Sequence, residues 1–92
     1  MATHLIIAGV VQGVGYRASF EAQARALKLA GWVRNRSDGS VEAVVHGEPQ
    51  ALQQIIDWAW RGPSLARVTT VSATNVDDTS LENGGFRVLP TK

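Results

Sequence analysis

The spacing of hydrophobic residues changes from the period of a strand to that of a helix within the first thirty residues. Residues 5–11 form a run rich in β-branched side chains that ends in a glycine-containing stretch, which predicts a strand followed by a loop. Residues 18–29 are mostly helix formers, and Phe20, Ala24 and Leu27 recur there at helical spacing. We therefore expect a strand, a glycine-rich loop and a helix.

A β-hairpin is predicted for residues 31–46. Trp32 and Val33 begin its first strand, and the Asp38-Gly39 pair is typical of a tight hairpin turn. Hydrophobic residues then alternate over positions 41–45, as expected for a strand with one buried face.

A second helix and two more strands complete the pattern. Pro49 suits the first turn of a helix, and residues 52, 55, 56 and 59 form a hydrophobic stripe that ends before Gly62-Pro63. The Val- and Thr-rich residues 67–75 predict a fourth strand. The remaining elements are a turn at Asn83-Gly84-Gly85 and a short final strand with Phe86 and Val88.

This order of elements predicts an α+β fold of the ferredoxin-like, split βαβ type (βαββαβ). Two helices would pack on one face of a four- to five-stranded antiparallel sheet, because alternating strands need one covered face. A chain of 92 residues without a linker or repeat is expected to form one domain, residues 1–92.

Composition and charge exclude several classes of protein. The chain has no cysteine, which excludes disulfides, thiolate chemistry and zinc–sulfur sites. The formal net charge is +1 and no long basic run occurs, so we expect neither a nucleic acid nor a membrane as partner. The N-terminus lacks the features of a signal peptide. We expect a soluble, cytoplasmic protein, with a monomer as the simplest state.

The first stretch with chemical potential is Val11-Gln12-Gly13-Val14-Gly15-Tyr16-Arg17, between the first strand and the first helix. Two glycines allow successive backbone N–H groups to converge on an anion, and the helix adds the positive end of its dipole. Arg17 adds a planar, permanent charge that matches phosphate oxygens. Taken alone, however, such a loop is often only a tight turn.

The second stretch is Gly31-Trp32-Val33-Arg34-Asn35-Arg36-Ser37-Asp38-Gly39. Asn35 lies where the strand meets the hairpin turn, and asparagine is common there simply because it helps a turn to form. The residues alone leave open whether Asn35 has a structural or a chemical role.

Together the two stretches resemble the signatures of the acylphosphatase family. Gly9 and Val11 to Arg17 resemble the phosphate loop of the family, and Gly31 to Asn35 with Gly39, Val41 and Gly47 resemble its second segment. Gly62-Pro63, residues 65–68 and Gly85-Phe86 are also similar, so the resemblance covers essentially the whole chain. Tyr16 departs from the pattern, because the family more often has Phe or Met at this position.

The resemblance implies a hydrolase that splits acyl phosphates into a carboxylate and inorganic phosphate. It implies that Arg17 and the loop Gln12, Gly13, Val14, Gly15, Tyr16 and Arg17 bind the phosphate and that Asn35 orients the attacking water. No metal and no cofactor are implied, and inorganic phosphate would be both product and competing ligand. Which acyl phosphate is the substrate stays open.

Two alternatives remain. A phosphate- or carbamoyl-phosphate-binding domain with little turnover would share the loop, although such domains in hydrogenase maturation proteins accompany zinc-finger cysteines that this chain lacks. An RNA-binding sheet would need aromatic residues on its two central strands, where we expect none. His4 and His46 have no carboxylate at ligand spacing and are read as sheet-face residues, and Asp77-Asp78 as a solvated turn. Roles for Trp58, Trp60, Arg34 and Arg36 stay open.

Overall fold

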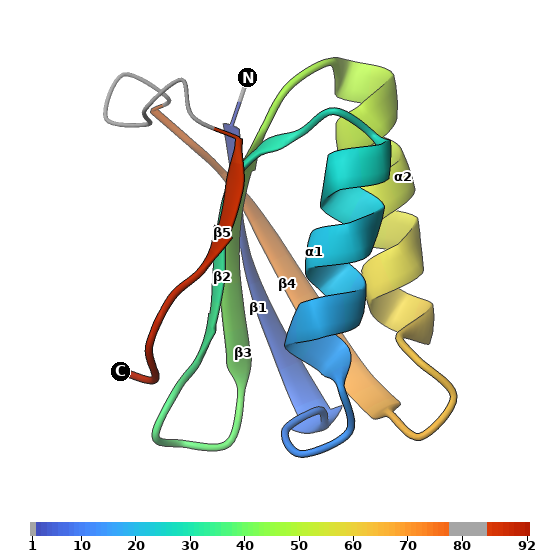
Figure 1. Cartoon of the computed structure of the whole chain (residues 1–92), viewed down its shortest axis with the longest axis vertical. Helices are drawn as coiled ribbons and strands as arrows, with labels where there is room; N and C mark the ends of the chain where they lie inside the picture. The colour runs from blue at the N-terminus through green and yellow to red at the C-terminus, as the bar shows by residue number, and fades with distance from the viewer. Residues whose placement is uncertain (1, 78–84) are drawn as a thin grey trace.

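The computed structural model describes residues 2–77 and 85–92. Two helices lie side by side on one face of a five-stranded sheet, and the other face is open (Figure 1). The elements are β1 (Ala2–Val10), α1 (Tyr16–Ala26), β2 (Ala30–Asn35), β3 (Val41–His46), α2 (Pro49–Arg61), β4 (Arg67–Val76) and β5 (Phe86–Val88). The predicted ferredoxin-like arrangement is confirmed.

The sheet has the strand order β4-β1-β3-β2-β5 and is mixed rather than wholly antiparallel. β1, β2, β3 and β4 pair antiparallel, whereas β5 runs parallel to β2. β4 runs opposite to β2, so it ends at the end of the sheet where β2 begins. β5 lies at the opposite edge of the sheet, beside β2, and it starts at the same end of the sheet as β2. It therefore runs in the same direction as β2, which explains the parallel pair.

The first helix differs from its predicted bounds, because it starts at Tyr16 and ends at Ala26. Lys28 has a positive φ of 59°, and the N–H of Leu29 donates to the carbonyl of Ala24 at 2.9 Å. This left-handed residue turns the chain out of the helix despite the good helix formers there, and it lets Leu29 enter the core.

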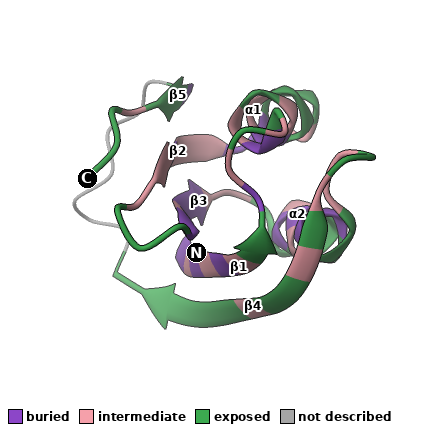
Figure 2. Cartoon of the chain, turned by 90° about the horizontal axis from the view of Figure 1, so that it is seen from below, coloured by how far each residue is buried: buried purple, intermediate pink, exposed green. Residues whose placement is uncertain are grey.

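One hydrophobic core lies between the sheet and the two helices (Figure 2). The helical stripe predicted for α2 supplies Leu52, Ile55 and Ala59, all buried. Trp58 is also buried, whereas Trp60 is 50% exposed, as expected for helical residues two positions apart. The strands and α1 contribute Leu5, Ile7, Phe20, Ala24, Val33, Val41, Ala43, Val45 and Phe86.

The short strand predicted around Phe86 and Val88 is confirmed as β5. The turn predicted just before it falls largely on residues 78–84 and lies outside the described residues. Among the described residues, no helix is long and apolar enough to cross a membrane.

Candidate active site

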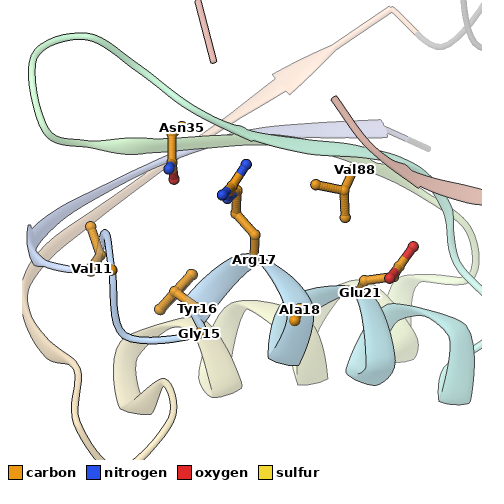
Figure 3. A pocket seen from close by; sticks show the side chains of 9 residues that line it. Val11, Gly15, Tyr16, Arg17, Ala18, Glu21, Asn35 and Val88 are labelled. Atoms are coloured by element: carbon orange, nitrogen blue, oxygen red, sulfur yellow. The ribbon is translucent and has the colours of Figure 1, made fainter. Parts of the chain in front are cut away.

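An open cavity of about 270 Å³ lies where the loop after β1, the start of α1 and the end of β2 meet (Figure 3). It brings Arg17 and Asn35, the two residues singled out in the sequence, to the same space. Gly13, Gly15 and Tyr16 of the loop line it as well. The two stretches therefore form one site.

The loop presents a row of backbone N–H groups to this site. Gly13 and Gly15 have φ angles of +76° and +79°, a left-handed conformation that glycine adopts without strain. The earliest helical hydrogen bond runs from the N–H of Ser19 to the carbonyl of Gly15, at 3.0 Å. In the described part of the chain, the N–H groups of residues 13–18 have no backbone acceptor. Free N–H groups at the positive end of a helix are the arrangement that suits an anion.

Arg17 is the second residue of α1, and its side chain extends from the helix into the cavity (Figure 3). Within residues 2–77 and 85–92 its guanidinium makes no ion pair and no hydrogen bond. No acidic residue stands in the first turn of the helix. Its donors are therefore available to an anion held by the loop.

Asn35 is the last residue of β2, and its Oδ1 is buried without a hydrogen-bond donor among the described residues. The hairpin turn does not use this side chain. Asp38 stabilises the turn instead, because its Oδ1 accepts from the Ser40 N–H at 2.9 Å and from the Ser40 hydroxyl at 2.6 Å. The turn-forming interpretation of Asn35 is therefore unsupported.

Gln12 holds the hairpin against the loop. Its Nε2 donates to the carbonyls of Arg36 at 2.7 Å and Ser40 at 2.8 Å. The side-chain amide of Gln12, which the sequence placed in the phosphate loop, is thus engaged with the backbone, and it fixes the strand end that carries Asn35.

Tyr16 contributes its backbone, not its ring, to the site. Its hydroxyl donates to the carbonyl of Ala59 at 2.8 Å, and the ring contacts Phe20 and Trp58 in the core. Burial raises the pKa of Tyr16, so the hydroxyl stays protonated. The departure from the family pattern is accommodated beneath the loop, where the hydroxyl finds a buried acceptor.

The C-terminal tail is hydrogen-bonded to the strand end that carries Asn35, a contact that the sequence analysis did not predict. The N–H of Lys92 donates to the carbonyl of Asn35 at 3.0 Å, and the N–H of Ser37 donates to the carbonyl of Lys92 at 2.9 Å. Leu89 donates in the same way to Val33, at 2.9 Å. The backbone around Asn35 is thus held on both sides, by β3 and by the tail.

The open face of the sheet carries a separate charged cluster. His4 Nε2 donates to Glu42 Oε2 at 2.7 Å, and Arg34 Nε donates to Glu42 Oε1 at 2.8 Å. The expectation that His4 lacks a neighbouring carboxylate is wrong, because the pairing of β1 with β3 brings Glu42 beside it. Arg34 also lies over the ring of Trp32, 4.6 Å from its centroid. Arg34 therefore serves this face and not the cavity.

The other three residues with open roles are now placed. Trp58 packs beneath the loop against Tyr16, and Trp60 lies on the exposed side of α2. Arg36 lines a second hollow, beside Asp38 and Lys92. Among the described residues, no three His, Asp or Glu side chains are grouped so that they could hold a metal ion.

The arrangement defines a class of site before any comparison is made. Gly13, Gly15, Arg17 and Asn35 line one cavity at a helix N-terminus, and within the described residues the loop N–H groups, the Arg17 guanidinium and the buried Asn35 Oδ1 have no hydrogen-bond partner. Backbone N–H groups at a helix N-terminus beside a free guanidinium are the kind of donors that suit a phosphate group.

Comparison with known proteins gives the family. A sequence model of the acylphosphatase family matches residues 3–88. The acylphosphatase of Thermococcus kodakarensis is 50% identical over 86 residues, which are 94% of this chain and 92% of that protein. The crystal structure of acylphosphatase from Bacillus subtilis is similar with a TM-score of 0.88 and 38% identity, covering 96% of this chain and 97% of that one. The chain belongs to the acylphosphatase family.

The same fold is found within a much larger protein. The crystal structure of full-length HypF in its phosphate- and nucleotide-bound form is similar with a TM-score of 0.87 and 27% identity. The similarity covers 98% of this chain but only 12% of that one.

Proposed function

We propose that this protein hydrolyses acyl phosphates to a carboxylate and inorganic phosphate. Arg17 and the N–H groups of residues 13–18 bind the phosphate, and Asn35 orients the attacking water. One observation carries the proposal. The Asn35 Oδ1 is a buried acceptor that has no donor among the described residues, and Asn35 lines the same cavity as Arg17. A water between the two would satisfy that oxygen.

The polar groups at the site suit this reaction. The leaving group is a carboxylate, a stable anion that needs no general acid. Phosphoryl transfer depends mainly on positioning and on stabilising charge at the phosphate oxygens. Arg17 and the loop N–H groups supply that stabilisation, so we expect turnover without a metal.

The proton balance also fits a site without a strong base. The water oxygen bonds to phosphorus, and the bond between phosphorus and the acyl oxygen breaks, with its electron pair leaving on the carboxylate. One proton of the water stays on the new P–O–H group, and the other passes to a phosphate oxygen. Asn35 only has to accept a hydrogen bond from the water and hold it in line, which requires its amide oxygen to turn toward the cavity that the residue lines.

The test is hydrolysis of benzoyl phosphate by purified protein in excess chelator, with Arg17→Ala and Asn35→Ala. Each substitution should lower kcat/KM by at least about 100-fold, the usual cost of removing one transition-state donor. Arg61→Ala and Asn75→Ala, at exposed positions outside the cavity, are the matched controls and should keep full activity. A near-normal Arg17→Ala enzyme would overturn the mechanism.

A binding domain with little turnover is the second candidate, favoured by the structural similarity to part of HypF. It predicts no hydrolysis of benzoyl phosphate, while inorganic phosphate still raises the melting temperature of the wild type but not of Arg17→Ala. We further propose that the protein is a cytoplasmic monomer that binds no nucleic acid. Light scattering measures the oligomeric state, and electrophoretic mobility-shift titration measures nucleic-acid binding.

A further inference from the structure

The cavity that contains Arg17 extends beyond the phosphate loop. Past Arg17 it is lined by Ala18 and Glu21 of α1 and by Val88 of β5 (Figure 3). Neither stretch with a family signature includes these three residues, and the proposed chemistry at phosphorus uses none of their side chains.

The direction of the reaction assigns this part of the cavity to the acyl group. The attacking and leaving oxygens of a phosphoryl transfer lie roughly in line, on opposite sides of phosphorus. Asn35 lies on one side of Arg17, and Val88 and Glu21 lie on the other (Figure 3). If Asn35 holds the water, the acyl group extends along Ala18 and Val88 toward the carboxylate of Glu21.

Glu21 is held at this place by Arg25. Arg25 Nη2 donates to Glu21 Oε2 at 3.2 Å and to the carbonyl of Phe86 at 2.8 Å. Since Phe86 and Val88 belong to the same strand, Arg25 fixes Glu21 relative to Val88. The Glu21 side chain is 31% exposed, so its charge is only partly screened by water.

We propose that Glu21 is a specificity-determining residue that selects against acyl phosphates whose acyl group carries a negative charge. The substrate class is then uncharged or cationic acyl phosphates, with apolar contact at Ala18 and Val88. The proposal rests on the proposed function of the site. Because Arg25 neutralises part of the charge and water screens the rest, the discrimination is about three- to tenfold.

The experiment compares two substrates of the same shape, benzoyl phosphate and 4-carboxybenzoyl phosphate. The quantity measured is the ratio of their kcat/KM values in the wild type, Glu21→Gln and Asp57→Asn. Asp57 is exposed on α2 and does not line the cavity, so its substitution controls for the change in net charge. The wild type should prefer benzoyl phosphate, and Glu21→Gln should reduce the preference at least about threefold. Asp57→Asn should retain both the activity and the preference.

Salt and binding measurements separate this proposal from the proposed function. In 0.5 M KCl the preference of the wild type should shrink toward that of Glu21→Gln, because salt screens the carboxylate. Calorimetric titration with benzoylphosphonate and 4-carboxybenzoylphosphonate, which are not hydrolysed, should give the same charge preference in dissociation constants.

Charge-dependent binding without turnover would support the role of Glu21 and overturn the hydrolase. Turnover or binding with equal ratios in the wild type and Glu21→Gln would overturn the role of Glu21 alone. A lack both of turnover of the two substrates and of binding of the two phosphonates, in wild-type protein that unfolds cooperatively, would overturn both.

Discussion

Asn35 and Tyr16 line the same cavity, but only one of their polar side-chain atoms has a hydrogen-bond partner among the described residues. The Tyr16 hydroxyl donates to the Ala59 carbonyl at 2.8 Å, and burial raises its pKa, so this group is fully committed to the core. The Asn35 oxygen is equally buried but has no donor among the described residues. A buried acceptor without a partner costs about 1–3 kcal/mol of folding stability. A water held at this position, as proposed, would donate to the oxygen and so explain why that cost is kept.

This contrast predicts that Asn35→Ala separates activity from stability. The substitution removes an unsatisfied acceptor and no recorded side-chain hydrogen bond, so the free energy of unfolding should change by less than about 1 kcal/mol, or rise. Val33→Ala in the same strand removes a fully buried side chain and should be clearly more destabilising. Urea unfolding of the two variants is the measurement. A large loss of stability in Asn35→Ala would show that its side chain has a structural role.

At the scale of elements, the site depends on how the phosphate loop is joined to the hairpin between β2 and β3. Gln12 makes this connection through two hydrogen bonds, to Arg36 and Ser40. In the proposed mechanism the loop holds the phosphate and Asn35 at the strand end holds the water, so Gln12 would set the distance between them. A positioning error of about 1 Å can cost ~100-fold in rate.

Replacing Gln12 with Met, which has similar length but no donors, should therefore lower kcat more than phosphate binding. We expect kcat to fall about tenfold and the free energy of unfolding to fall by about 1–2 kcal/mol, one increment for each lost hydrogen bond. The inhibition constant of inorganic phosphate should change less than kcat, because Arg17 and the loop N–H groups remain. Equal changes in both would mean that Gln12 shapes the anion nest itself.

Most of the element order and the two central site residues follow from the sequence, but several connections do not. Arg17 and Asn35 stand in two stretches that resemble family signatures, and it is this resemblance, not the residues alone, that predicted one site for them. The Gln12 side chain donates to backbone carbonyls, and the Lys92 hydrogen bond joins two backbone groups. Every residue has such backbone groups, so the residue types do not predict these bonds. The pairing of His4 with Glu42 depends on strand register, which one sequence specifies only through its alternation.

The early end of α1 was missed for a related reason. Residues up to Leu29 have ordinary helix propensity, but burying Leu29 in the core outweighs continuing the helix. The parallel pairing of β5 is likewise a property of the whole topology, since a short strand can join either edge in either direction until its neighbours are known.

At the scale of the whole molecule, the open face of the sheet ties stability to pH through Glu42. Burial raises the pKa of this carboxyl, but hydrogen bonds from His4 and Arg34 outweigh that effect and leave the pKa below its usual value. A group whose pKa is lower in the folded state stabilises the fold when ionised. That stabilisation is present above the usual glutamate pKa of about 4.3 and is lost as the pH falls through the lower folded value.

Glu42→Gln should therefore flatten the dependence of unfolding free energy on pH below about 4.3. At neutral pH the variant should be less stable than the wild type, and the gap should narrow in acid. Urea unfolding at pH 7 and pH 3 measures the effect, with Glu48→Gln, an exposed position at the start of α2, as the control. A gap that does not change with pH would show that the carboxylate charge of Glu42 contributes nothing.

The strand order has a consequence for how the chain reaches this structure. Only β2 and β3 are hairpin neighbours, whereas β1 pairs with β3 on one side and with β4 on the other, where Ala2 lies opposite Val76. Pairing the first strand with one so late in the sequence closes a long loop before the contacts that offset its entropy are made. Chains dominated by such distant contacts fold slowly, on the timescale of milliseconds to seconds. The loop at residues 11–15 and α1 directly follow β1, the strand with this distant partner. The cavity that contains Arg17 is therefore expected to be completed only when the slowest step of folding is over.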